Sequence, residues 1–201
     1  MDKKYKAKAN DSFRTKLELY LFDRISSGLM QHINHSDFKD FHISQMLVEL
    51  FSTVYWQELQ EYQIRNKTIA EIERSISNWK SENKPLITEF QKYYVNEMFA
   101  EIFPEEKFNL LTKSDTCAYC GITIGQIEKL GTGHKLHKKN YRGWTLEIDR
   151  LDSNFEYTPD NTVMACYWCN NAKTDEFTFE EFKLVGRSIK QIWNIRLNDY
   201  K

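Results

Sequence analysis

The sequence lacks several features, and each absence excludes a class of protein. Its 201 residues contain no uncharged apolar run of about 18 residues, the length from which a membrane-spanning helix is inferred. No charged segment followed by an apolar one opens the chain, so secretion is not expected. Neither basic nor acidic residues dominate, because 28 Lys and Arg face 29 Asp and Glu, for a net charge of −1. A protein that holds nucleic acid by overall charge alone would be more basic.

Glycine and proline are also scarce, with 7 and 3 residues, and most of the glycines lie in one segment. Residues 1–116 contain only Gly28, whereas five glycines fall between residues 121 and 143. With 41% apolar and 14% aromatic residues, the chain can bury a core. We therefore expect a helical N-terminal domain over residues 1–112 and a second domain over residues 113–201.

The N-terminal part has the three- and four-residue spacing of apolar positions that is typical of amphipathic helices. One helix is expected at about residues 13–33, and the first ten residues, which include four lysines, are expected to be loose. Pro85 suits the first turn of a later helix, and Pro104 ends its run. The apolar positions that set this pattern are Leu47, Leu50, Phe51, Val54 and Tyr55, then Ile69, Ile72, Ile76 and Trp79, then Leu86, Phe90, Tyr94, Met98 and Ile102.

The four cysteines are arranged as two pairs of identical spacing, Cys117-Ala-Tyr-Cys120 and Cys166-Tyr-Trp-Cys169. Two residues between the cysteines let one tight turn present both thiolates to one ion, and two such pairs complete the tetrahedron that Zn²⁺ favours. A closed set of four thiolates leaves no position for water, so this zinc is expected to be structural. The alternative is buried apolar thiols or disulfides, which would not require two matched pairs. Reduced cysteines also fit a cytoplasmic protein.

Between the two pairs, two short runs of β-branched and apolar residues flank a polar stretch. Residues 144–151 and 161–166 are expected to be strands, and residues 152–160 the loop between them. Polar, helix-compatible residues follow Cys169, and residues 178–181 form a capping box that opens a closing helix. The expected fold class is therefore α+β, mainly α, with the order strand, loop, strand, helix in the C-terminal domain.

The segment from Cys117 to about Phe182 resembles an HNH nuclease module of the ββα-metal type, in the version where two cysteine knuckles hold the finger together. In that family the first strand ends in Asp-His, an Asn opens the second strand, and the helix supplies a His or Asn shortly before a Lys. The residues that match in this order are Asp149, Asn161, Asn170 and Lys173. Arg150 stands where the family has its histidine.

The resemblance implies a metal-dependent endonuclease that hydrolyses phosphodiester bonds in nucleic acid, with DNA as the expected substrate. It places one divalent ion, Mg²⁺ or Mn²⁺, on Asp149 and Asn170, whose oxygen ligands suit such ions. The family's histidine removes a proton from the attacking water, which an arginine that is always charged cannot do. Arg150 is instead expected to bind a phosphate and to offset charge in the transition state. His134 and His137, just upstream, are the nearest candidates in sequence for the general base.

Each motif residue also has a purely structural interpretation. Asp149 could initiate the following turn, and Asn170 could cap the helix. Asn161 follows Pro159-Asp160, so it could brace the loop, a role that the resemblance itself gives to this Asn. Glu147 lies two residues before Asp149 on the same strand face, as an outer carboxylate of the ion site or as a solvated side chain. The occurrence of all three motif residues together favours the site.

A basic segment precedes the first strand and could follow a phosphate backbone. Tyr141 and Trp144 beside it could stack on bases, although charge runs on a glycine-rich loop are usually solvated. The residues expected to bind nucleic acid are Lys135, Lys138, Lys139, Arg142 and, on the helix, Lys173.

The helical N-terminal domain has two interpretations as well. Its apolar stripes form its own core, or they form a surface that docks a protein partner or recognises a target. Small HNH proteins with an added helical half resemble components of restriction, phage defence or mobile elements, which is the expected context. The competing function is a zinc module that binds nucleic acid or a partner protein without cutting. His32, His35 and His42 could suggest a second metal site, but they lack partners at ligand spacing and are expected at the surface.

Overall fold

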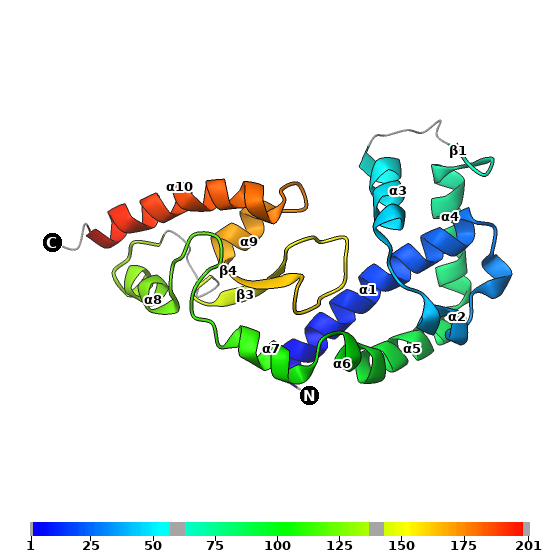
Figure 1. Ribbon diagram of the computed structural model, residues 1–201, viewed down its shortest axis with the longest axis horizontal. Coiled ribbons are helices and arrows are strands. Elements are labelled where there is room, and N and C mark those ends of the chain that lie inside the picture. The colour runs from blue at the N-terminus through cyan, green and yellow to red at the C-terminus, as the bar shows by residue number, and fades with distance from the viewer. Residues whose placement is uncertain (1, 57–62, 137–142, 199–201) are drawn as a thin grey trace. The chain divides into compact units, whose positions relative to one another are not determined.

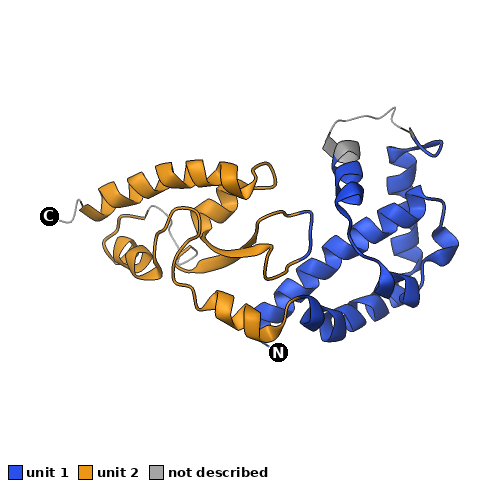
Figure 2. Cartoon of the chain, in the orientation of Figure 1, with its two compact units in different colours: residues 1–102, 154–156 blue, residues 103–153, 157–201 orange. Residues whose placement is uncertain are grey.

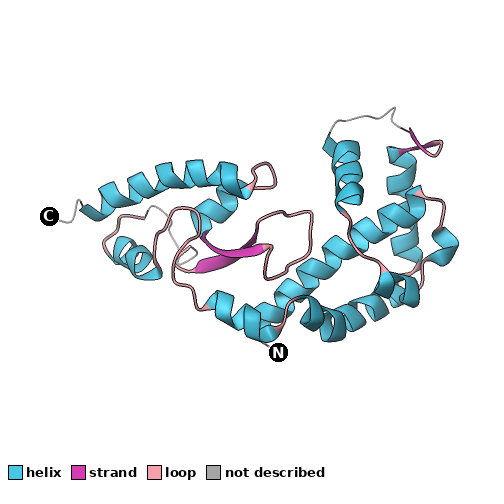
Figure 3. Ribbon diagram, in the orientation of Figure 1, coloured by secondary structure: helices cyan, strands magenta, loops and turns pink. Residues whose placement is uncertain are grey.

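The computed structural model describes residues 2–56, 63–136 and 143–198, and of residues 53–56 and 63 only the backbone. These residues are mainly helical, with two short antiparallel sheets of two strands each (Figure 1, Figure 3). In the described residues no helix combines the length and the apolarity that crossing a membrane requires. The elements are α1 (Lys3–Ser26), the 3₁₀ turn η1 (Met30–His32), α2 (His35–Asp40), α3 (Gln45–Trp56), β1 (Gln63–Ile64), β2 (Lys67–Thr68), α4 (Ile69–Glu82), α5 (Lys84–Tyr93), the π turn η2 (Tyr94–Met98), α6 (Phe99–Ile102), α7 (Glu105–Thr112), α8 (Ile124–Thr132), β3 (Leu146–Arg150), β4 (Thr162–Cys166), α9 (Tyr167–Lys173) and α10 (Phe179–Asn198).

The chain divides into two compact units (Figure 2). Unit 1 contains residues 1–102 together with residues 154–156, and unit 2 contains residues 103–153 and 157–201. The domain boundary expected between residues 112 and 113 stays a prediction. The expected fold class is confirmed, because the fold is mainly α with a C-terminal hairpin that is followed by one short helix and one closing helix.

The first helix begins at Lys3, so the expectation that the first ten residues are loose is wrong. Asp2 caps this helix, since its side chain accepts a hydrogen bond from the backbone N–H of Lys4 at 3.3 Å. Tyr5 is 1% exposed, and its ring centroid lies 4.9 Å from that of Phe99. Burial of this aromatic side chain holds the first turn in place while the lysines beside it face solvent.

The same helix ends at Ser26, so the end expected near residue 33 is also wrong. Gly28 adopts a φ of 73°, a left-handed conformation that glycine takes without steric cost. The backbone N–H of Leu29 then donates to the carbonyl of Arg24 at 2.7 Å and satisfies one of the last helical acceptors. The chain therefore leaves the helix at a glycine turn that the apolar spacing does not reveal.

The core of unit 1 is built largely from aromatic rings. Phe38 on α2 stacks on Phe90 on α5, with centroids 4.6 Å apart and planes 3° apart. The apolar stripe of α5 continues through η2 and α6, and Pro85 occupies the first turn of α5 as expected. Further rings of this core, each at most 3% exposed, are Tyr5, Phe13, Tyr20, Phe22, Tyr94 and Phe99.

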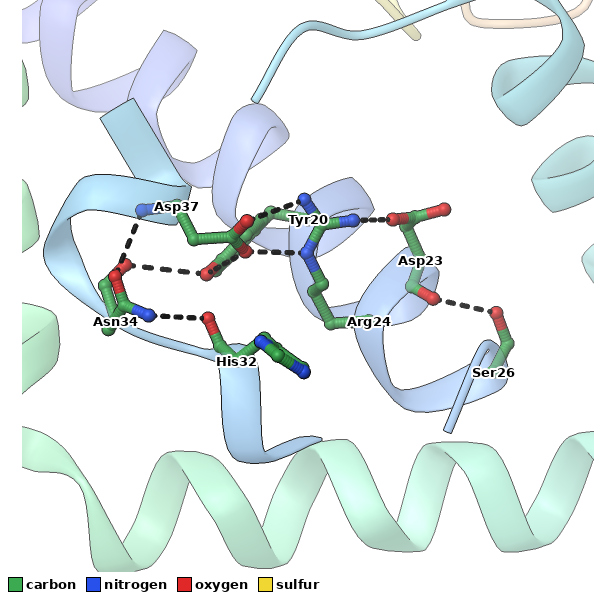
Figure 4. A network of polar contacts seen from close by, with 7 residues as sticks. All are labelled: Tyr20, Asp23, Arg24, Ser26, His32, Asn34 and Asp37. Atoms are coloured by element: carbon green, nitrogen blue, oxygen red, sulfur yellow. Dashed lines mark hydrogen bonds and ion pairs between the residues drawn. The ribbon is translucent and has the colours of Figure 1, made fainter. Parts of the chain in front are cut away.

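A polar network ties α1 to α2 (Figure 4). The Nε and Nη2 of Arg24 donate to the carboxylate of Asp37 at 2.5 and 3.0 Å, and the hydroxyl of Tyr20 donates to it at 2.9 Å. The hydrogen bonds from Arg24 lower the pKa of the Asp37 carboxyl. The backbone N–H of Asp37 donates to the side chain of Asn34 at 3.0 Å, which caps α2. These side chains stabilise the helix pair.

Unit 2 is built around the hairpin of β3 and β4. The strands are antiparallel, with Leu146 opposite Cys166 and Arg150 opposite Thr162. α9 begins at Tyr167, immediately after β4, and both β3 and β4 contact it. The order strand, loop, strand, helix expected from the sequence is therefore present, and α10 closes the unit against α8 and α9.

Gly186 lets α10 approach the first cysteine knuckle closely. A Cβ added at this position would lie 2.6 Å from the backbone oxygen of Tyr119, which is closer than any side chain tolerates. The ring of Tyr119 packs between two rings of α10, with centroid distances of 5.3 Å to Phe179 and 5.1 Å to Phe182. The knuckle and the closing helix therefore form one packed layer.

Candidate metal centre and hydrolytic site

The two cysteine pairs meet in the interior of unit 2. Their four sulfur atoms all lie within 4.8 Å of one another, and all four residues are buried. The Sγ atoms of Cys120 and Cys166 are 3.7 Å apart, and all four cysteines are free thiols. Two distant segments are thus brought together as the spacing predicted, and the cluster has the size of a site for one ion.

Each pair owes its position to a local backbone feature. The first pair lies on a tight turn in which the N–H of Gly121 donates to the carbonyl of Cys117 at 2.9 Å. Gly121 has a φ of 69°, which favours glycine at this point. In the second pair, Cys166 ends β4 and directly precedes α9, and Cys169 lies in the first turn of that helix. A turn and a strand-to-helix junction therefore supply two sulfur atoms each.

The donor set fits Zn²⁺. Hydrogen bonds among the thiols lower the pKa of Cys117 and raise the pKa values of Cys166 and Cys169. Four thiolates this close repel one another, so ionisation of all four requires a cation between them. Four sulfur ligands in a tetrahedral arrangement are typical of structural zinc. Cys117, Cys120, Cys166 and Cys169 are the residues that would hold it.

Asp149 is the fourth residue of β3, and the first cysteine knuckle reaches it. The hydroxyl of Tyr119 donates to the Oδ2 of Asp149 at 2.6 Å. Burial raises the pKa of the Asp149 carboxyl, while the hydrogen bond from Tyr119 and the charges of Lys173 and Arg150 oppose this shift. Asp149 is thus a half-buried carboxyl with an oriented donor, rather than only the start of a turn.

Asn170 is in the first turn of α9, directly after Cys169, and is linked to the same strand. Its Nδ2 donates to the Oε2 of Glu147 at 2.6 Å. Glu147 and Asp149 are two residues apart in β3, so their side chains leave the same face of the hairpin. A carboxylate that fixes the amide nitrogen leaves the amide oxygen as the ligand atom of Asn170. The shared cation on Asp149 and Asn170 stays a prediction.

Lys173 and Arg150 form a second link between α9 and β3. The Nζ of Lys173 donates to the backbone oxygen of Arg150 at 3.1 Å, and Lys173 is only 2% exposed. The guanidinium carbon of Arg150 lies 4.9 Å from the ring centroid of Tyr157. The amine of Lys173 therefore holds the end of β3 in place. The expected contact of Lys173 with nucleic acid stays a prediction. The expected contact of Arg150 with a phosphate also stays a prediction.

Asn161 braces the loop between the strands. Its Nδ2 donates to the carbonyl of Asp152 at 3.0 Å, and its Oδ1 accepts from the N–H of Asp152 at 2.9 Å. Its carbonyl also accepts from the N–H of Leu151 at 3.0 Å. These bonds match the loop-bracing interpretation of this residue, and they position the strand ends that carry Asp149.

We expect Asn161→Ala to lower the free energy of unfolding by about 2 kcal/mol, because two side-chain hydrogen bonds to half-buried backbone groups are lost. Urea unfolding followed by circular dichroism measures this change. The matched control is Asn171→Ala, which removes an exposed amide of α9. An equal stability for the Asn161 variant and the wild type would contradict the bracing role.

The basic insert is described only in part. His134 is exposed and has a φ of 56°, and the backbone oxygen of Lys135 accepts from Arg196 at 3.2 Å. Trp144, expected as a stacking ring, instead packs on α8, since a Cβ added at Gly131 would lie 2.4 Å from its indole. The other residues expected here, His137, Lys138, Lys139, Tyr141 and Arg142, lie outside the described residues.

The histidines of unit 1 do not form a metal site. Over residues 2–56, 63–136 and 143–198, the four cysteines are the only group of three or more His, Cys, Asp or Glu placed to share an ion. His35 instead packs against Tyr93, with ring centroids 4.6 Å apart. His32, His35 and His42 are all exposed.

Two residues of the site escaped the sequence interpretation in whole or in part. Tyr119 lies between two cysteines and belongs to no sequence motif, and no spacing rule points from it to Asp149. Glu147 lies on the strand face that the sequence predicts, but the sequence favours a solvated side chain at this position. The structure gives Glu147 a hydrogen bond from Asn170, and only the paired hairpin and helix bring the two side chains together. The role of Glu147 beside an ion stays a prediction.

Comparisons with known proteins found a partial likeness to a solved structure. The chain is similar to the rare-cutting HNH restriction endonuclease PacI, with 34% sequence identity. The match covers 43% of this chain and 58% of PacI, with a TM-score of 0.36. No protein-family model and no curated protein matches the chain. The buried four-cysteine cluster agrees with the two cysteine knuckles on which the resemblance to HNH nucleases rests.

Proposed function

We propose that the chain is a metal-dependent HNH endonuclease that hydrolyses phosphodiester bonds in DNA. The observation that carries this proposal is the arrangement of one hairpin and its following helix. Asp149 and Glu147 share a face of β3, and the amide of Asn170 on α9 is held by Glu147. The similarity to PacI, described as a restriction endonuclease that perturbs DNA, supports the same reaction.

Two kinds of ion belong to this proposal, and they have different roles. Zinc on the four cysteines is structural, because a closed thiolate sphere leaves no position for water. A hard ion, Mg²⁺ or Mn²⁺, suits the oxygen atoms of Asp149 and Asn170. When bound, such an ion supplies Lewis-acid chemistry and stabilises the leaving oxygen of the phosphodiester.

The chain's own residues do the rest. Tyr119 and Glu147 hold the two ligand side chains in orientation. Arg150 carries a permanent charge that binds a phosphate at two points and offsets charge in the transition state. An arginine does not accept the proton of the attacking water. His134 and His137 are the candidates for that base. Lys135, Lys138, Lys139 and Arg142 would lie along the nucleic acid.

The direct test is an ion-dependent cleavage assay with the full, zinc-loaded chain. Plasmid, single-stranded DNA and RNA are each incubated with Mg²⁺, with Mn²⁺ or with EDTA. We expect nicked or linear plasmid with either ion and none with EDTA. If no substrate is cut with any ion while gel shifts show binding, the chain is instead a zinc module that recognises nucleic acid or a partner. The observation that favours this second function is Arg150 at the position of the motif histidine, because an arginine cannot accept the proton of the attacking water.

The proposal also includes a biological setting. An HNH nuclease with an added helical unit suits restriction, phage defence or a mobile element, in the cytoplasm where thiols stay reduced. Unit 1 would then bring the nuclease to its target or dock a protein partner. The salt dependence of DNA binding tests the charge part of this account, because local contacts from a few basic side chains weaken steeply as salt rises.

A further inference from the structure

We propose that Tyr119, inside the first cysteine knuckle, is a positioning residue that orients the carboxylate of Asp149 and thereby sets the affinity of the site for its divalent ion. This inference rests on the proposed function and adds a residue to its site. Tyr119 touches neither ion nor substrate in this account. It acts through the Asp149 carboxylate, which it contacts by a single hydrogen bond.

The contact is short and directional. The hydroxyl of Tyr119 lies 2.6 Å from the Oδ2 of Asp149, the usual length for a hydroxyl that donates to a carboxylate. A carboxylate has two oxygen atoms, so a fixed donor on Oδ2 determines the direction in which Oδ1 presents itself. Hydrogen-bond partners of this kind fix metal ligands in other proteins, and their loss typically weakens metal binding by about 10- to 100-fold.

The tyrosine ring itself is held rigidly. Tyr119 is 5% exposed, and it packs against Phe179 and Phe182 at centroid distances of 5.3 and 5.1 Å. Its backbone lies against Gly186, where an added Cβ would come within 2.6 Å of the Tyr119 oxygen. A side chain held on this many sides loses little additional freedom when it fixes a neighbour.

The zinc knuckle and the hydrolytic strand are also joined through the backbone. The N–H of Ala118, beside Tyr119, donates to the carbonyl of Met164 on β4 at 2.8 Å. Val163, which directly precedes Met164 in β4, is the strand partner of Asp149. The cysteines on either side of Tyr119 therefore fix the tyrosine relative to the carboxylate that it orients. Both knuckles serve the site, since Asn170 directly follows the last cysteine of the second.

Tyr119→Phe tests the proposal, because it deletes the hydroxyl and keeps the ring. Binding of Mn²⁺ to zinc-loaded protein is measured by electron paramagnetic resonance of the free ion, independently of cleavage. We expect the dissociation constant for Mn²⁺ to rise about tenfold. We also expect cutting to be slow at limiting Mn²⁺ and to recover at saturating Mn²⁺, a pattern that a general loss of stability does not produce.

Tyr20→Phe is the matched control. It removes a hydrogen bond of the same kind, from a buried tyrosine to Asp37 at 2.9 Å, but within unit 1 (Figure 4). We expect it to lower the melting temperature and to leave the affinity for Mn²⁺ unchanged. Wild-type Mn²⁺ affinity and wild-type Mn²⁺ dependence in Tyr119→Phe would overturn the inference while the proposed function stands.

Two further variants separate a failure of the proposed function from a failure of this inference. If wild-type protein binds no Mn²⁺ beyond the level of Asp149→Asn, the proposed function fails, and the inference fails with it. If Tyr119→Phe does not fold, Gly186→Ala takes its place, because the added Cβ displaces the Tyr119 backbone and keeps every polar group. Weaker Mn²⁺ binding in folded Gly186→Ala supports the inference, and unchanged binding overturns it.

Discussion

Replacing Asp149 with asparagine is expected to slow DNA cutting by about 10³-fold or more, since the site loses the charge that holds its divalent ion. Asparagine has nearly the same shape, and its side-chain oxygen can still accept the hydrogen bond from Tyr119. Burial raises the pKa of the Asp149 carboxyl, so the neutral side chain does not cost folding free energy. Single-turnover cleavage of plasmid at saturating Mg²⁺ measures the loss.

Two neighbouring residues give matched controls for this site. Asp175→Asn is the control for Asp149→Asn, because it makes the same chemical change at an exposed position after α9. Asn171→Ala is the control for Asn170→Ala, because it removes an exposed amide from the same helix. We expect both controls to cut at the wild-type rate. We expect Asn170→Ala to lose cutting as Asp149→Asn does, with zinc content and helicity unchanged. Equal rates for the wild type and both site variants would end the assignment of the ion.

Removing the metal from the cysteines has the second large expected effect, the unfolding of unit 2. Structural zinc binds four-ligand sites with about 10–16 kcal/mol, as much as the whole stability of a typical domain. The four buried sulfur atoms join the turn after α7 to the junction of β4 and α9. Without the ion, their mutual repulsion opposes that contact. A strong chelator, or Cys169→Ser, should therefore abolish the near-ultraviolet signal of the tryptophans in unit 2.

The controls separate the two ions. A metal assay should find one zinc per folded chain, and adding Zn²⁺ back to the chelated protein should restore the signal. Removing Mg²⁺ and Mn²⁺ by gel filtration, without a chelator, should stop cutting and leave the spectrum unchanged. Cobalt in place of zinc should show the visible absorption of a tetrahedral thiolate site. A fully folded, zinc-free protein would contradict the structural role of the cluster.

The metal cluster could be predicted from the sequence because its information is local. Cys117 and Cys120 share one turn, as do Cys166 and Cys169, and only one closed arrangement uses all four. The hairpin could be predicted for the same reason, from two short runs of β-branched and apolar residues that flank a polar loop. These features depend on spacing along the chain, which a sequence displays directly.

The bounds of α1 and the neighbours of Asp149 could not be predicted in this way. The first turn of α1 is held by Tyr5 against Phe99, a contact between residues far apart in the chain. The hydroxyl of Tyr119 meets Asp149 only because the knuckle, β4 and α10 are packed together. Tertiary contacts of this kind leave no periodic signal, so sequence patterns name the motif residues and miss the residues that orient them.

Anomalous diffraction from crystals of the zinc-loaded chain soaked in Mn²⁺ is the most direct measurement of the central claim. The account predicts a manganese peak between the carboxylate of Asp149 and the amide oxygen of Asn170, distinct from the zinc peak at the four sulfur atoms. A zinc peak alone, with these two side chains turned away from each other at saturating Mn²⁺, would contradict it.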